Sequence, residues 1–272
     1  MPDCVRLLQH KTEAYWFYRV LSLVYDRWVN PLFWTPEMRT AALAAAALEE
    51  RSLRTLDVGA GTGFTSEGIV EHVDAHRLTL LDQSPHQLAR ARVKPSLARC
   101  AKVIGDAERL PFAGDRFDRY VSAGSIEYWP DPQRAIAEAY RVLRADGRAL
   151  LIGPVRPANP VLRRLADAWM LFPTEQQYRE WLSRAGFTDV ELVALAPSWY
   201  RSSRGAYAVA ASGRKPAAGS SPLALPPPAE PAGAGRMRSA LRFAGGSLAG
   251  ALFVPLAAVL ALRHRLQERR TT

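Results

Sequence analysis

Short hydrophobic runs alternate with helix-like segments along the middle of the chain. The hydrophobic runs predict strands at 53–58, 77–81, 101–104, 117–123 and 148–152. Segments with helical spacing lie between them, at 63–72, 85–93 and 132–143. A further helix at 175–185 and strands at 190–195 and 206–211 follow. This alternation predicts a mostly parallel sheet with helices on both faces, formed by a domain over 53–211.

The regions on either side of this domain have other patterns. Residues 14–34 are rich in Tyr and Trp at helical spacing, and residues 37–51 are rich in alanine. We expect 1–52 to form a helical segment on the substrate side of the domain. Residues 212–235 are rich in proline and glycine without an apolar period, which predicts a linker.

The segment after the linker is uniformly apolar. Residues 243–262 carry no charge and are bracketed by Arg242 and Arg263. Twenty helical residues span about 30 Å, the thickness of the hydrocarbon core of a bilayer. The alternative is a buried core helix. The pattern favours a single transmembrane helix followed by a basic tail over 263–272.

The charge of the chain does not indicate a nucleic-acid partner. The net charge is +10, but residues 229–272 hold seven arginines against two glutamates, which is 7 − 2 = +5 and half of the total. Cys4 and Cys100 are the two cysteines, too few for a disulfide framework. No histidine is paired with cysteine at zinc spacing, so we expect no metal site. The first residues lack the pattern of a signal peptide.

A glycine-rich turn follows the first predicted strand of the domain. The stretch "LDVGAGTGF" at 56–64 places Gly59, Gly61 and Gly63 between a strand and a helix, with Asp57 just before them. Such a turn lets a ligand lie against the backbone beside a helix N-terminus. The spacing is one residue shorter than the dinucleotide fingerprint, which argues against a dehydrogenase.

Polar residues follow the next strands at the same edge of the predicted sheet. Asp82 ends the second strand, where a carboxylate can accept from both ribose hydroxyls, and Asp106 in "GDAERLPF" can accept from an adenine amino group. The stretch "SAGSIEYW" follows the fourth strand. The predicted cofactor-binding residues are Asp57, Gly59, Gly61, Thr62, Gly63, Asp82, Gln83, Asp106, Ala107, Ala123 and Gly124.

These motifs resemble, in order and spacing, those of the class I S-adenosylmethionine-dependent methyltransferases. "LDVGAGTGF", "LLDQS", "GDAERLPF" and "YRVLRADGRALLIGP" carry the resemblance. It implies S-adenosylmethionine as the cofactor and a Rossmann-like fold, with a seven-stranded, mostly parallel sheet whose last strand is reversed.

A narrower resemblance rests on motifs outside the cofactor site. "QHKTEAYWFYRVLSLVYD", "YVSAGSIEYWPDPQRAIAEAYRVL", "ADAWMLFP" and "WYR" are similar to the 2-methyl-6-phytylbenzoquinol (MPBQ/MSBQ) methyltransferases of tocopherol and plastoquinone synthesis. The resemblance runs from about 9 to 216 and implies C-methylation of the aromatic ring of a prenylated hydroquinone. The hydrophobic segment after the linker also fits that family.

For methyl transfer to a ring carbon we expect either a general base that removes the proton from the adjacent phenol or a group that stabilises the phenolate. Glu127 and Tyr128 follow the fourth strand, and Tyr25 and Asp26 lie on the predicted N-terminal helix, so these four are the candidate catalytic residues. The alternative for Glu127 is a surface carboxylate that caps the helix at Pro132, and for Asp26 an ordinary salt bridge.

Other functions remain open at this point. The chain can instead methylate another membrane lipid, such as a ubiquinone or menaquinone precursor, a sterol or a phospholipid amine. It can also be a non-catalytic membrane scaffold that binds the cofactor. The expected partners are a prenylated quinol and a lipid bilayer. The expected location is a membrane, held by the C-terminal helix, with the catalytic domain on the cytoplasmic side in a bacterium or the stromal side of the plastid inner envelope.

Overall fold

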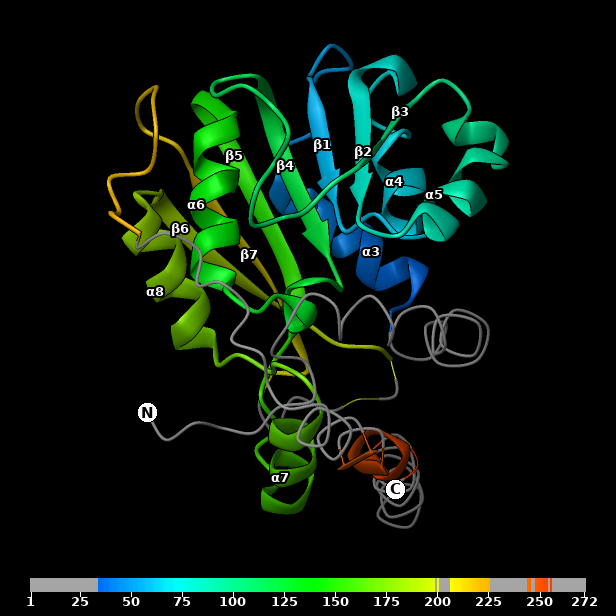
Figure 1. The fold of residues 1–272 in the computed structure, drawn as a ribbon, viewed down its shortest axis with the longest axis vertical. Coiled ribbons are helices and arrows are strands. Elements are labelled where there is room, and N and C mark those ends of the chain that lie inside the picture. The colour runs from blue at the N-terminus through cyan, green and yellow to red at the C-terminus, as the bar shows by residue number, and fades with distance from the viewer. Residues whose placement is uncertain are drawn as a thin grey trace, which may run out of the picture.

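The protein is built around a seven-stranded sheet whose strands run in the order β3-β2-β1-β4-β5-β7-β6 (Figure 1). This computed structural model describes residues 34–198, 200, 206–225, 244–245, 248–253 and 255. The first five strands are parallel, and β7 is antiparallel to both β5 and β6. The Rossmann-like fold and the reversed last strand that the motifs imply are therefore confirmed.

The helices and strands follow the predicted order, with differences at their ends. The strands are β1 Thr55–Val58, β2 Leu78–Asp82, β3 Ala101–Ile104, β4 Phe117–Ala123, β5 Leu143–Pro154, β6 Thr188–Leu195 and β7 Ala208–Arg214. The helices are α3 Pro36–Leu43, α4 Phe64–Ile69, α5 Pro85–Arg92, α6 Pro132–Val142, α7 Pro160–Trp169 and α8 Glu175–Ala185. Short 3₁₀ turns lie at η2 Ala44–Ala46, η3 Ala75–Arg77, η4 Pro95–Leu97 and η5 Ile126–Tyr128.

Hydrophobic side chains fill both faces of the sheet. One cluster joins the sheet to α6 and α8 through Ile136, Tyr140, Tyr178 and Leu182. The other joins it to α3, α4 and α5 through Met38, Ile69 and Leu88. Figure 1 shows these two layers of helices on opposite sides of the strands. Since the parallel strands all point the same way, the turns after β1, β2, β3 and β4 meet at one edge of the sheet.

The expected transmembrane helix over 243–262 is wrong. Among the residues that the structure describes, no helix is long and apolar enough to cross a bilayer. The described residues of this region, 244–245, 248–253 and 255, are called the C-terminal segment below. Its Ala249 and Phe253 are buried in a cluster with Trp169 and Met170, whereas Leu248 and Leu252 are exposed. One face of the segment therefore contacts protein, which hydropathy averaged over all faces does not reveal.

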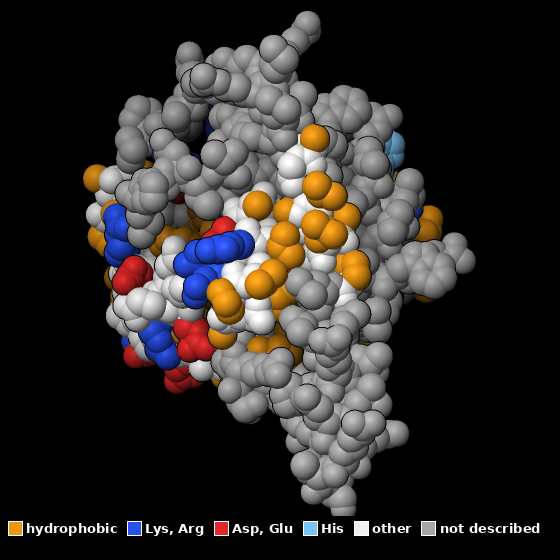
Figure 2. All heavy atoms as spheres, turned by 90° about the horizontal axis from the view of Figure 1, so that it is seen from below, with side chains coloured by type: hydrophobic (Ala, Val, Ile, Leu, Met, Phe, Trp, Pro, Cys, Tyr) orange, Lys and Arg blue, Asp and Glu red, His pale blue; other side chains and the backbone are white. Residues whose placement is uncertain are grey.

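Helix α7 was not expected from the sequence. Asn159 caps it, because its side chain accepts hydrogen bonds from the backbone N–H groups of Val161 and Leu162, and Pro160 occupies the first helical position. Figure 1 shows α7 extending beyond the strands. Seen from this end, hydrophobic side chains of the described residues gather near the centre of the surface (Figure 2).

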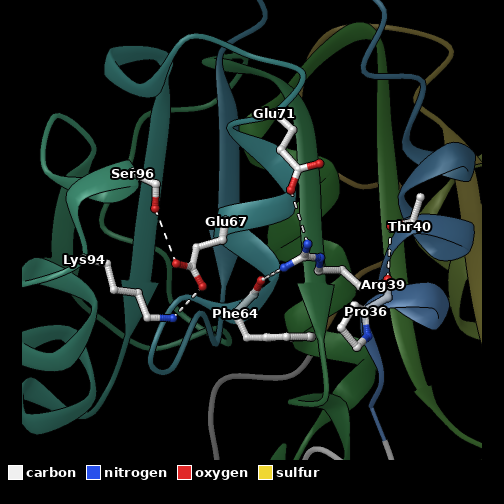
Figure 3. A network of polar contacts seen from close by, with 8 residues as sticks. All are labelled: Pro36, Arg39, Thr40, Phe64, Glu67, Glu71, Lys94 and Ser96. Carbon is white, nitrogen blue, oxygen red and sulfur yellow. Dashed lines mark hydrogen bonds and ion pairs between the residues drawn. The ribbon is translucent and has the colours of Figure 1, made fainter.

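An arginine joins helix α3 to α4, the helix that follows the glycine-rich turn (Figure 3). Arg39 donates to the backbone oxygen of Phe64 at 3.0 Å and to Glu71 at 3.3 Å, and its guanidinium lies 4.8 Å from the Phe64 ring centre. The helix predicted over 37–51 ends early, because Ala47 adopts a positive φ of 51° and its oxygen accepts from Arg119. Helix α3 therefore supports the start of α4.

The end of the sheet is fixed by a buried lysine. Strand β7 continues to Arg214, beyond the expected start of the linker at 212, and Lys215 is fully buried. Its ammonium donates to Asp115 at 2.8 Å and to the oxygens of Leu143 and Gly219 at 2.6 Å each. The ammonium also lies 4.7 Å from the ring centre of Tyr140. Residues up to Gly219 are thus held on the domain.

We predict that Lys215→Met lowers the free energy of unfolding by about 3 kcal/mol, because three acceptors lose a charged donor. The matched control is Lys94→Met, since Lys94 pairs with Glu67 at 2.7 Å in a partly exposed position. We expect that control to cost about 1 kcal/mol or less. Urea unfolding of the two variants measures the difference, and equal losses would contradict the structural role of Lys215.

Candidate active site

The glycine-rich turn leaves one stretch of backbone open. Gly59, Gly61 and Gly63 have φ values of 71°, 54° and 83°. A Cβ at Gly59 would lie 2.4 Å from the Ser125 side chain, so packing requires glycine there. A Cβ at Gly61 would meet no atom within 4 Å. The space beside Gly61 is therefore available to a ligand that lies against the backbone.

Asp82 holds this turn in place. Its carboxylate accepts hydrogen bonds from the backbone N–H of Gly61 and from that of Ser84, each at 2.8 Å. The turn after β1 is also bonded to β2, because the N–H groups of Gly59 and Ala60 donate to the oxygen of Leu81. A carboxylate has about four acceptor sites, so Asp82 can position the turn and still accept from a ligand hydroxyl.

Two further carboxylates connect the turns after β3 and β4. Asp106 accepts from the N–H of Glu108 at 3.0 Å. Glu108 is buried and accepts from the N–H of Asp131 at 2.9 Å. The Asp131 side chain in turn caps α6 by accepting from the N–H of Arg134. The acidic turn after β3 is thereby fixed against the turn that leads into α6.

A pocket lies at this edge of the sheet, between the turns that follow the strands. Of the predicted residues, Gly59, Asp82, Gln83, Asp106, Ala107 and Tyr128 line it. The predicted residues Asp57, Gly61, Thr62, Gly63, Ala123 and Gly124 do not line it. Sequence reasoning missed the lining residues Val58, Leu81, Gly105, Glu108, Ser125, Trp129 and Pro130. Most of these lie inside the motifs already singled out, so the spacing of the motifs contained the signal.

Asp57 lies behind the glycine-rich turn as a buried carboxyl group. It is 1% exposed, and one oxygen accepts from the Ser66 hydroxyl at 2.5 Å. Its other oxygen is buried without a hydrogen-bond partner among the described residues. Burial raises the pKa of Asp57 to about 7, the Ser66 hydroxyl opposes this shift, and the charge of Asp82 adds to it. A cationic ligand nearby would stabilise the ionised form.

The residues around the pocket suit a positively charged nucleoside ligand. S-adenosylmethionine carries a sulfonium and an ammonium group, and the pocket is lined by Asp82, Asp106 and Glu108 with Asp57 close behind the turn. The open backbone at Gly61 gives such a ligand a surface to lie on. No group of three His, Cys, Asp or Glu side chains within the described part of the chain could hold a metal ion.

The candidate catalytic residues are only partly brought together. Glu127 and Tyr128 belong to η5, directly after Ser125, and Tyr128 lines the pocket. Glu127 is 8% exposed and one of its carboxyl oxygens is buried without a partner among the described residues. Burial raises the pKa of Glu127 to about 7. Glu127 is therefore not the surface cap of α6, a position that Asp131 fills. Tyr25 and Asp26 lie outside the described residues.

Comparisons of the sequence identify its relatives. Residues 56–151 match the family model described as a methyltransferase domain. The chloroplastic 2-methyl-6-phytyl-1,4-hydroquinone methyltransferases of Spinacia oleracea and Arabidopsis thaliana are 55% and 56% identical over 228 residues, which is 83% of this chain. The matches cover 66% and 68% of those proteins, so the chain spans about two thirds of their length.

More distant relatives share a smaller part of the chain. The ubiquinone/menaquinone biosynthesis C-methyltransferase UbiE of Sinorhizobium fredii is 42% identical over 122 residues, 43% of this chain and 47% of that protein. In all these comparisons the matched proteins are methyltransferases.

Solved structures share the fold. A SAM-dependent methyltransferase of Thermotoga maritima has a TM-score of 0.57 at 22% identity, with 74% of this chain and 99% of that chain covered. An S-adenosylmethionine-dependent methyltransferase of Mesorhizobium loti has a TM-score of 0.54 at 21% identity, with 65% and 99% covered. These likenesses show the fold, and the plant relatives show the family. The chain belongs to the 2-methyl-6-phytyl-1,4-hydroquinone methyltransferases, a family of S-adenosylmethionine-dependent enzymes, as its motifs predict.

Proposed function

We propose that the protein transfers the methyl group of S-adenosylmethionine to a ring carbon of a prenylated hydroquinone of the 2-methyl-6-phytyl or 2-methyl-6-solanesyl type. The observation that carries this proposal is the identity of 55% to the spinach enzyme over 83% of the chain. The product would belong to a tocopherol- or plastoquinone-like pathway. The residues matched by the methyltransferase model, 56–151, include every turn that lines the pocket.

The chemistry divides between the cofactor and the protein. The sulfonium supplies an activated methyl group, so the protein must bring donor and acceptor into line and exclude water. A phenol has a pKa near 10, and its ring carbons become nucleophilic when the proton leaves. Formation of the new carbon–carbon bond would break the sulfur–methyl bond and leave a neutral thioether, and loss of the proton on the methylated ring carbon would restore the aromatic ring. The Glu127 carboxylate is the proposed acceptor of that proton, because its pKa of about 7 allows it to ionise near neutral pH.

Glu127 is not among the residues that line the pocket. Its neighbours in the chain, Ser125 and Tyr128, do line the pocket. Catalytic hydrogen bonds often form only in the substrate complex, so this position is compatible with a general base. We propose that Tyr128, which lines the pocket, contacts the acceptor ring, and that Tyr25 and Asp26 are candidates for the same role.

The acceptor's long hydrocarbon tail resides in a bilayer, so we place the reaction at a membrane surface. The exposed side chains of Val161 on α7 and of Leu248 and Leu252 on the C-terminal segment give this end of the molecule an apolar surface. The curated relatives are named as chloroplastic. In a plastid-bearing organism we place the catalytic domain on the stromal side of the inner envelope, and in a bacterium on the cytoplasmic side.

Transfer of label from S-adenosylmethionine to a panel of quinols in liposomes tests the proposed activity. We expect methylation of 2-methyl-6-phytyl- or 2-methyl-6-solanesyl-benzoquinol, and co-sedimentation of the protein with the liposomes. A demethylated ubiquinone or menaquinone precursor is the matched comparison, because the UbiE proteins share part of the sequence. Preference for that precursor, or no transfer to any quinol, would contradict the proposed substrate.

Asp82→Ala is expected to weaken S-adenosylmethionine binding about ten- to a hundredfold, the equivalent of about 1.5–3 kcal/mol for a hydrogen bond to a charged group. The variant also releases the backbone N–H of Gly61, so the loss has two sources. Asp74→Ala is the control, because Asp74 lies before β2, at the other end of that strand. Calorimetry measures both affinities, and an unchanged affinity in folded Asp82→Ala would remove Asp82 from the cofactor site.

Glu127→Gln keeps the shape of the side chain and removes its charge. If Glu127 accepts the phenol proton, turnover should fall about 100-fold or more. The cofactor affinity should stay near that of the parent. Because burial raises the pKa of Glu127, the parent's rate should rise with pH through about 7 as the carboxyl ionises, and the variant should lose this limb. A rate within about threefold of the parent would assign proton transfer to Tyr128, Tyr25, Asp26 or a bound water.

A further inference from the structure

The C-terminal segment returns to the end of the sheet that carries the pocket. Phe253 places its ring centre 5.5 Å from that of Trp169 and 5.4 Å from that of Phe172, and the Trp169 and Phe172 centres are 6.3 Å apart. These separations are within the range of favourable aromatic contact. Ala249 and Phe253 of the segment are buried in this cluster, together with Ala166 and Met170. The contact joins residues about 80 positions apart in the sequence.

This aromatic cluster reaches the pocket through one residue. Tyr128 belongs to the cluster and also lines the pocket. The backbone N–H of Leu171, just after α7, donates to the backbone oxygen of Glu127 at 3.2 Å. The end of α7 is therefore fixed against the same turn, η5, that carries the candidate base.

A glycine allows the C-terminal segment to approach α7 closely. A Cβ at Gly250 would lie 2.6 Å from Nε1 of Trp169 and 2.7 Å from its Cε2. The indole is 4% exposed, so it has little room to move away. A Cβ at Gly245, in the same segment, would meet no atom within 4 Å. The two glycines thus provide one position that tests the contact and one that does not.

The position of this aromatic cluster indicates which part of a ligand it would contact. The two large hydrophobic clusters fill the spaces between the sheet and its helices. Trp169, Phe172 and Phe253 instead cluster with Tyr128, which lines the pocket. The pocket itself is lined by three carboxylates, which do not favour a hydrocarbon chain. An acceptor whose polar ring meets the cofactor beside Tyr128 would therefore extend its apolar tail towards this cluster.

We propose that the C-terminal segment and α7 together form the apolar wall of the acceptor site, in which Phe253, Trp169 and Phe172 hold the hydrocarbon part of the quinol. This inference rests on the proposed function, because it takes the prenylated quinol as the occupant. It makes the segment a determinant of acceptor binding. We expect the cofactor site, which the turns after β1, β2 and β3 form, not to depend on the segment.

The test compares Gly250→Val with Gly245→Val in the full chain. Both substitutions add the same side chain to the same segment, but only that at Gly250 meets Trp169. We expect Gly250→Val to raise the KM for a phytyl quinol about tenfold or more, the effect of losing a central aromatic contact. The effect on a quinol with a short tail should be smaller. The affinity for S-adenosylmethionine, measured by calorimetry, should stay at the parent's value in both variants.

Phe253→Ala repeats the test without forcing two groups together. Val93→Ala is its control, because Val93 is a hydrophobic side chain that is 80% exposed at the C-terminus of α5, away from the C-terminal segment. Equal KM values in each pair, or a parallel loss of cofactor affinity at Gly250→Val and Phe253→Ala, would overturn the inference.

Direct binding of phytyl quinol, measured by equilibrium dialysis, distinguishes a failure of this inference from a failure of the proposed activity. If the parent binds the quinol without methylating it, only the proposed activity is contradicted. The dissociation constants of the variants then show whether the segment contributes to quinol binding. A parent that does not bind the quinol contradicts both.

Discussion

The arrangement of the pocket depends on the Asp82 carboxylate. Its hydrogen bond to the turn after β1 connects the end of that strand to the end of β2. Asp82 ends β2 and accepts from the backbone of the glycine-rich turn after β1 and from Ser84 before α5. The parallel pairing of β1 with both β2 and β4 then brings the turn with Ser125 against Gly59. The residues that line the pocket therefore come together because the strands that precede them end at the same edge of the sheet. Arg39 supports the arrangement from outside by bonding to Phe64 at the start of α4.

Two buried carboxyl groups without full hydrogen bonding flank this edge. Asp57 and Glu127 each have an oxygen that is buried without a partner among the described residues, and burial raises the pKa of both to about 7. Such groups are costly for folding, and they are typical of functional sites. In the proposed function, Asp57 would stabilise the cationic cofactor from behind the glycine-rich turn, and Glu127 would accept the phenol proton. The two shifted groups would then serve the two halves of the proposed methyl transfer from a sulfonium to a phenol.

The sequence predicted the sheet well because its strands and helices alternate in a strong local pattern. It also predicted the motif residues at the strand ends, since parallel strands must place them together. The sequence-based predictions fail where contacts between distant parts of the chain determine the structure. Hydropathy alone could not show that Ala249 and Phe253 pack on α7. Helix α7 begins with the cap of Asn159 and Pro160, which is a local helix-start signal in the sequence. The burial of Lys215 and Glu108 depends on hydrogen-bond partners far away in the chain, an acceptor for Lys215 and a donor for Glu108, which no local pattern reveals.

Amide hydrogen exchange of the full chain tests most directly the claim that donor and acceptor meet at this edge of the sheet. S-adenosylhomocysteine, the demethylated cofactor, should slow exchange at 59–63, 82–84, 105–108 and 125–129. Subsequent addition of phytyl quinol should further slow exchange at 127–129, 169–172 and 248–253, with no change around Lys215 at the far end of the sheet. Protection by the quinol at a separate surface, or none at the turns that line the pocket when S-adenosylhomocysteine binds, would contradict the account.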